Sequence, residues 1–173
     1  MKSPKLFCLI AVFFMITFNS CGFVIKSYIN KDTENIPPDF GKEKTTLLVI
    51  QKPKSYKKKV EKIIQQHYTG NYIIVTREEL DDKYKDPATY RYILDDDISI
   101  SKMYLVTITK DLSTGFETKT KEPLSSASRS FHILDRQTKK IHDTGVSSGT
   151  SWKKILKVYL EKLDSERIKN GGK

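Results

Sequence analysis

An uncharged apolar run near the amino terminus divides this chain into a leader and a part that folds. Residues 6–18 carry no charge, and Lys2 and Lys5 precede them. A positively charged start followed by a short apolar run is typical of a secretory signal peptide. The run is shorter than the roughly 20 apolar residues that a helix needs to cross a hydrocarbon core. We therefore predict a cleavable leader rather than a permanent transmembrane helix.

The apolar run ends in small residues and a cysteine, in the order Asn19, Ser20, Cys21, Gly22. This stretch resembles the lipobox of bacterial lipoproteins, in which the cysteine is diacylated before the leader is cut off. The resemblance implies that 1–20 is a lipoprotein signal peptide and that Cys21 carries two or three acyl chains such as palmitate. Two or more chains anchor a protein stably, whereas one does so only marginally. Cleavage after Ser20 or Gly22, which would release a soluble secreted protein, is the alternative.

The charge of the chain restricts the partners of an exported protein. The formal net charge is +10, and Lys2 and Lys5 contribute to it only until the leader is removed. In a cytosolic protein this excess would suggest a nucleic acid. Export removes that partner, so we expect no nucleic-acid binding. Anionic headgroups, acidic glycans and acidic protein surfaces remain, and a solvated lysine-rich surface is the simpler alternative.

Neither cysteine is available for a structural disulfide. Cys8 lies in the leader and Cys21 is expected to carry lipid. The remaining chain is long enough to bury a proper core. We expect that core to hold the fold, although the envelope would permit disulfides.

The first part of the folded region reads as strand, helix, strand. Residues 45–51 and 71–76 are short apolar runs rich in β-branched residues, which predict two buried strands. Between them, helical spacing predicts a helix from a Ser55 cap through His67. Its apolar face comprises Tyr56, Val60, Ile63, Ile64 and His67. A strand–helix–strand crossover places its two strands parallel in one sheet.

The rest of the folded region predicts further strands and a last helix. Short strands are expected at 90–94 and 102–110, with a solvated break at 95–97 and a loop or hairpin tip over 111–124. Residues 125–135 and 140–144 predict an antiparallel hairpin. A helix capped by Ser151 follows, with Trp152, Ile155, Leu156, Tyr159 and Leu163 at helical spacing.

These elements predict one α/β (α+β) domain over 45–169. The domain is a mixed β-sheet with a β-α-β start, an antiparallel hairpin and a carboxy-terminal amphipathic helix packed on the sheet. Residues 21–44, with Pro37 and Pro38, are expected to form a tether. The apolar residues within 23–29 would lie at the membrane interface or add an edge strand. Residues 170–173 are expected to form a frayed tail.

Catalytic chemistry has weak support in the sequence. His132 and Asp143 can face each other if the predicted hairpin is symmetric about its turn. Such a pair orients an imidazole for general-base work, but no serine stands in a nucleophile motif, so we favour a cross-strand surface pair. Residues 95–97 lack the alternation and glycine of a calcium loop. We expect no catalytic residue, no metal ion and no cofactor, and the sequence identifies no small-molecule ligand.

A cluster of lysines lies near the start of the predicted helix 55–67, where positive charge is unfavourable. Cations in the first turn are disfavoured by the helix macrodipole by about 0.3–1 kcal/mol each. The cluster comprises Lys52, Lys54, Lys57, Lys58, Lys59 and Lys62. It predicts a patch that binds an anion or a partner, and a solvated lysine face is an equal alternative.

The order of elements over 45–163 resembles the TolB amino-terminal-domain-like fold, including the LpoB-like domains of envelope lipoproteins. Two stretches carry the likeness. In 71–80 a strand runs into Arg77-Glu78-Glu79-Leu80, and in 133–141 a hairpin turn contains Asp, Thr and Lys. The resemblance implies a domain that binds other envelope proteins and does not catalyse a reaction.

We therefore expect a non-enzymatic envelope lipoprotein that binds or scaffolds other envelope components. Its partners would be the membrane, through lipid on Cys21, and an envelope protein. Because Gly22 rather than Asp follows the cysteine, the outer membrane is the expected location, with the domain facing the periplasm. The alternative is a secreted or lipid-anchored hydrolase that uses the His132–Asp143 pair.

Overall fold

One mixed sheet forms the centre of the chain that the structure describes. The structure is a computed structural model and describes residues 25–29, 34–43, 46–110, 115 and 117–172. Its strands are β1 (Leu47–Ile50), β2 (Tyr72–Val75), β3 (Tyr92–Lys110), β4 (Glu117–Asp135) and β5 (Ile141–Asp143). Its helices are α3 (Lys54–His67), α4 (Arg77–Asp82) and α5 (Trp152–Lys169), and residues 25–29 are also helical.

The strands lie in the order β2-β1-β3-β4-β5. Strand β1 pairs in parallel with both β2 and β3, whereas β4 is antiparallel to β3 and to β5. This confirms the predicted α/β domain with a mixed sheet, a β-α-β start, an antiparallel hairpin and a last helix packed on the sheet.

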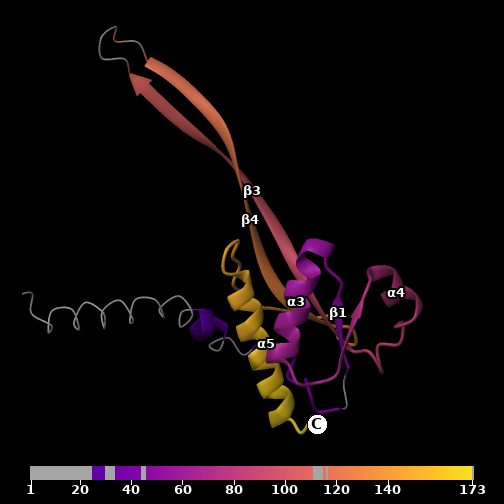
Figure 1. Ribbon diagram of the computed structural model, residues 1–173. Coiled ribbons are helices and arrows are strands. Elements are labelled where there is room, and N and C mark those ends of the chain that lie inside the picture. The colour runs from indigo at the N-terminus through magenta and orange to yellow at the C-terminus, as the bar shows by residue number, and fades with distance from the viewer. Residues whose placement is uncertain (1–24, 30–33, 44–45, 111–114, 116, 173) are drawn as a thin grey trace, which may run out of the picture.

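Helices α3 and α5 cover one face of the sheet and form the main core with it (Figure 1). The helical stripes predicted from the sequence supply their buried sides, since Val60, Ile64, Ile155 and Tyr159 are all buried. Full burial of such a side chain contributes roughly 1.5–3 kcal/mol. The strands contribute Leu47, Val49, Tyr92, Leu94, Phe131 and Ile133 to this core.

The opposite face of the sheet carries a smaller core. Leu48, Ile50, Val75 and Ile93 form this cluster, with Leu80 of α4 packed against it. Strand β1 is therefore buried on both faces, which explains its continuous apolar sequence.

Strands β3 and β4 are far longer than predicted and leave the body as a two-stranded ribbon (Figure 1). Their antiparallel register is continuous from the pair Tyr92–Asp135 to the pair Lys110–Glu117. The expected break at 95–97 and most of the expected loop at 111–124 are therefore wrong. Strand β3 continues through Asp95, Asp96 and Asp97 because each of these carboxylates lies beside a basic or histidine side chain.

The expected tether at 21–44 is also wrong where the structure describes it. Ile29, Ile36 and Phe40 are buried in the main core, so the domain begins before residue 45. Gly41 approaches α5 so closely that a Cβ there would lie 2.4 Å from the Cα of Arg167. The tail expected to fray at 170–173 is also held as far as residue 172, because the side chain of Asn170 donates to the carbonyl of Phe40 at 2.8 Å and the amide of Gly172 donates to the carbonyl of Arg167 at 2.9 Å.

The helix ends differ in detail from the predictions. Helix α3 begins at Lys54 after Pro53, so Ser55 lies inside its first turn. Ser151 precedes α5 as predicted, but its side chain makes no capping hydrogen bond. None of the helices among the described residues combines the length and the apolar character of a membrane span.

The packing of residues 34–43 against α5 is tested by Gly41→Ala. Gly41 has φ +87°, and an added Cβ would collide with the backbone of Arg167. We expect the free energy of unfolding to fall by about 3 kcal/mol. Gly145→Ala is the control, since Gly145 has φ +66° and open space around it, and it should lose only about 1 kcal/mol. Urea denaturation measures both, and equal losses would contradict the close packing.

Candidate functional site

The ribbon formed by 98–110 and 117–129, here called the arm, is the most unusual surface of the molecule. At about 3.3 Å per residue, its strands extend roughly 40 Å beyond the body. Figure 1 shows the arm projecting alone, away from α3, α4 and α5. A two-stranded ribbon with no packing partner is only marginally stable in water. The arm is therefore a surface that a partner would stabilise.

One face of the arm combines apolar and basic side chains. In β3 this face carries Ile98, Ile100, Tyr104, Val106 and Ile108, each more than half exposed. The same face carries basic side chains from both strands, at Lys102, Lys110, Lys119 and Lys121. The ammonium of Lys121 lies 4.4 Å from the centre of the Tyr104 ring. Lys102 separates Ile98 and Ile100 from Tyr104, Val106 and Ile108 along this face, and soluble proteins rarely leave so many large apolar side chains uncovered on one face.

The other face of the arm is rich in hydroxyl groups. Serines and threonines occupy most of its positions, apart from Glu122 and a small group formed by Met103, Leu105 and Leu124. The three apolar side chains are also more than half exposed. The two faces therefore offer different chemistry, and the apolar and basic one is the better candidate for a contact.

The outer edges of β3 and β4 in the arm are also available for pairing with another strand. Strand β1 pairs with β3 only at Ile93 and Leu94, and β5 pairs with β4 only from His132 to Leu134. One isolated bridge joins Arg129 to Ser148. Beyond these points, the described residues include no strand that pairs with either edge of the arm. Unpaired edges present backbone donors and acceptors that another chain can bind.

Buried ion pairs hold the root of the arm, where β3 leaves the core. Lys52, which follows β1, pairs with both Asp95 and Asp96, and its side chain is only 9% exposed. Arg77 lies 2.6 Å from Asp95, and Arg129 lies 2.7 Å from Asp96. Burial raises the pKa of Asp95, but hydrogen bonding and charge from Lys52, with the charge of Arg77, outweigh it. The pKa therefore lies below its ordinary value.

Aromatic side chains of helices α3 and α5 pack against the same root. The guanidinium of Arg129 lies 3.7 Å from the centre of the Tyr56 ring. That ring in turn contacts Trp152 of α5, with their centres 4.2 Å apart. Helices α3 and α5 thus fix the direction in which the arm leaves the body.

The predicted lysine patch is only partly assembled. Lys52 is buried in its ion pairs and does not belong to an exposed patch. The sequence could not show this, because the pairing aspartates lie more than 40 residues away. Lys57 lies 3.8 Å from Glu61. The exposed members of the patch are Lys54, Lys58, Lys59 and Lys62 on α3.

Of the other candidate residues, His132 and Asp143 are neighbours across β4 and β5, as the hairpin register predicted. Asp97 joins them, with Oδ2 3.1 Å from Nδ1 of His132. Cys21, the expected lipidation site, lies outside the described residues.

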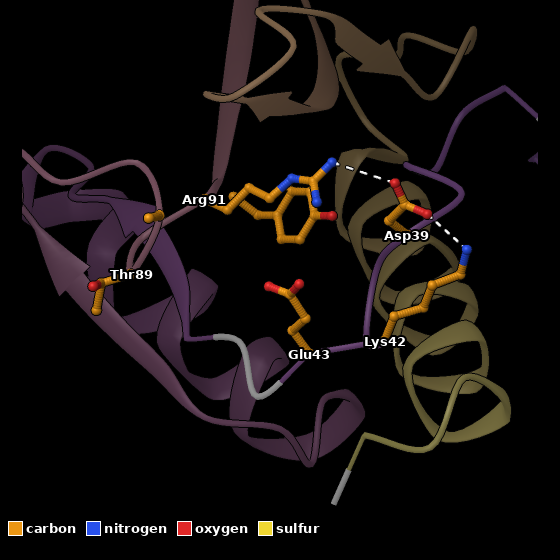
Figure 2. Close-up of a pocket in the computed structure, with 7 residues that line it drawn as sticks. Asp39, Lys42, Glu43, Thr89 and Arg91 are labelled. Carbon is orange, nitrogen blue, oxygen red and sulfur yellow. Dashed lines mark hydrogen bonds and ion pairs between the residues drawn. The ribbon is translucent and has the colours of Figure 1, made fainter.

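A pocket of about 250 Å³ lies where residues 39–43 meet the start of β3 (Figure 2). In it Asp39 lies 2.7 Å from Lys42 and 3.5 Å from Arg91. Arg91 also makes two hydrogen bonds with Asp135, of 2.9 and 2.8 Å. Asp39, Lys42 and Arg91 are thus engaged with other charged side chains, and the pocket contains none of the predicted site residues.

Comparison with known proteins finds no matching family model and no match among curated proteins.

The exposed arm is the surface that sequence reasoning missed. The alternation of Tyr104, Val106 and Ile108 was visible and correctly placed these side chains on one face of a strand. The same pattern predicts a strand whose apolar face is covered. Whether that face is covered depends on how far α3 and α5 extend along the sheet. This is a property of the tertiary structure, and the sequence pattern of the strand does not contain it.

The ion pairs at the root predict a pH-dependent loss of stability in Lys52→Met. At pH 7 the variant leaves the carboxylates of Asp95 and Asp96 without their nearest cation. We expect its free energy of unfolding to fall by about 3 kcal/mol. Because the pKa of folded Asp95 is lowered, the contribution is complete above the unfolded value of about 3.9. It disappears as the pH falls through the lower folded value.

Urea denaturation at pH 7 and pH 3 measures this effect. The difference between wild type and Lys52→Met should be large at pH 7 and should shrink at pH 3. Lys59→Met, at an exposed position on α3, is the matched control and should change stability by less than about 0.5 kcal/mol. A Lys52→Met variant as stable as the control at pH 7 would contradict the role of these ion pairs.

Proposed function

We propose that this protein is a non-enzymatic lipoprotein of a bacterial envelope that binds or scaffolds an envelope protein through its arm. The single observation that carries the proposal is the uncovered apolar and basic face of the arm. It includes five large side chains of β3 that are each more than half exposed. Their transfer out of water would drive association at about 25 cal/mol per Å² of apolar surface.

The charge on this face selects the chemistry of the partner. Lys102 and Lys119 have no ion-pair partner among the described residues, and Lys110 lies 3.9 Å from Glu117. Two copies that met through this face would bring like charges together, which disfavours self-association. An acidic surface with an apolar centre is complementary to it.

The backbone favours a protein over a lipid bilayer as the occupant. Backbone groups that enter hydrocarbon without hydrogen bonds cost several kcal/mol each. Both edges of the arm have unpaired backbone groups, so its insertion into a bilayer would be unfavourable. A protein can instead add a strand to an edge and satisfy these groups, as in β-strand addition.

The anchor and the arm have separate roles in this proposal. Lipid on Cys21 holds the protein at the membrane, with the outer membrane and a periplasmic orientation as the proposed location. The arm then reaches roughly 40 Å from the body. An anchored protein with such a reach can hold a partner at a distance from the membrane surface.

The arm is tested by the triple variant Tyr104→Ser, Val106→Ser, Ile108→Ser. These exposed side chains lie outside the core, so the melting temperature should stay close to that of wild type. Affinity purification from gently solubilised membranes, with quantitative mass spectrometry, should recover an envelope protein with wild type and at least about tenfold less with the variant. The protein identified is then purified and titrated directly against both.

The matched control is Ser101→Ala, Thr107→Ala, Thr109→Ala, on the opposite face of the same strand. It should retain the partner. Equal recovery with both triple variants would contradict the proposed surface. Binding to anionic phospholipid vesicles that is lost in the first variant, without any protein partner, would assign the face to lipid and overturn the proposal.

The anchor is tested by metabolic labelling with a fatty acid. Wild type should incorporate the label and fractionate with membranes, because two or more acyl chains anchor stably. Cys21→Ala should lose the label, whereas Cys8→Ala, in the leader, should keep it. A wild-type protein that stays unlabelled would overturn the lipoprotein assignment and return the chain to the secreted class.

A further inference from the structure

Three strands at the root of the arm bring together one imidazole and two carboxylates. Asp97 comes from β3, His132 from β4 and Asp143 from β5, and their ligand atoms all lie within 4.8 Å of one another. We propose that these three side chains bind a divalent transition-metal ion of the zinc class. This inference does not depend on the proposed function of the arm.

The strand register explains how the three side chains meet. His132 lies directly opposite Asp143 across the β4–β5 pairing. On its other side, His132 lies opposite Asp95 of β3, and Asp97 is two residues further along. Residues two apart share one face of a strand. Asp97, His132 and Asp143 therefore project from the same face of the sheet.

Asp95 has other partners. It shares this face of the sheet, but its carboxylate oxygens are bonded to Lys52 and Arg77. Asp97 and Asp143 are the other two carboxylates beside the imidazole, and Oδ1 of Asp143 also accepts a hydrogen bond from the backbone amide of Gly145 at 2.6 Å.

The spacing of the donor atoms suits a shared metal ion. The Nδ1 atom of His132 lies 3.1 Å from Oδ2 of Asp97. Two ligands at about 2.0–2.1 Å from a tetrahedral zinc ion lie roughly 3.3–3.4 Å apart. The donor atom of Asp143 lies within 4.8 Å of the other two, and an ion bound by all three would draw this carboxylate closer to His132.

His132 supplies an independent observation, because its Nδ1 atom is buried and makes no hydrogen bond. The side chain is only 11% exposed, whereas that of Asp97 is 71% exposed. Buried polar atoms are nearly always hydrogen-bonded. The short approach to Asp97 is thus misaligned for a hydrogen bond, and a metal ion between the two atoms would satisfy both.

The donor set selects the class of metal. An imidazole with carboxylates suits zinc and neighbouring transition ions, whereas calcium and magnesium prefer oxygen ligands throughout. Three protein ligands leave at least one position for water or for a group from a partner. The ion would join β3, β4 and β5 where the arm begins.

Linear spacing could not reveal this site. Its ligands are separated in sequence and lack the short spacings of known zinc motifs, so the sequence alone predicts no metal site. The register of two strand pairings brings them together.

The test is calorimetric titration of the full-length protein with ZnCl₂, in parallel with the double variant Asp97→Asn, Asp143→Asn. Asparagine keeps the size of each side chain but removes its charge. Wild type should show a zinc site that the double variant binds at least about tenfold more weakly. Both proteins contain the same cysteines, so zinc bound by thiols would contribute equally. Titration with CaCl₂ should show no binding to this site.

The matched control is Asp81→Asn, Asp82→Asn, at two exposed carboxylates of α4, which should bind zinc as wild type does. Circular dichroism without metal should show that all three proteins are folded. Zinc should also raise the melting temperature of wild type and of the control more than that of the double variant. Absence of zinc binding by wild type, or equal affinity in the double variant, would overturn the proposal.

Discussion

Buried charge pairing at the root of the arm allows one strand to pass from the core into solvent. Strand β3 begins between two apolar clusters and then meets Asp95 and Asp96, whose side chains are almost fully buried. A buried carboxylate without a partner is strongly destabilising. Lys52 lies against both carboxylates, and Arg77 and Arg129 complete the pairing. These ion pairs lie at the point where β3 and β4 leave the core, so they hold both strands there.

The same root couples the helices, the sheet and the arm. Arg129 pairs with Asp96 on one side and stacks on Tyr56 on the other, so α3 contacts the base of β4. The opposite face of the root carries Asp97, His132 and Asp143. A contact made along the arm would act on strands that are held at this point by ion pairs and, in our proposal, by a metal ion.

Two predictions from the sequence, the break at 95–97 and the tether at 21–44, were wrong for physical reasons. Three consecutive aspartates predict a solvated break, because isolated carboxylates are costly to bury. Their pairing with Lys52, Arg77, Arg129 and His132 depends on contacts distant in sequence. Likewise Pro37 and Pro38 predict an extended tether, yet Ile36 and Phe40 on either side of them reach the core. Local composition carries no information about either outcome.

The sequence by itself determined helices α3 and α5, strands β1 and β2, and the buried faces of the two helices, because hydrophobic periodicity is local. The stripes of α3 and α5 and the apolar run of β1 lie in the core as predicted. Tertiary structure alone decided that 92–110 is one strand, that Lys52 is buried, and that Asp97 lies beside His132 and Asp143. Each of these depends on strand register and on charge pairing between distant residues. The uncovered face of the arm has the same origin, since coverage depends on how far the packed helices extend.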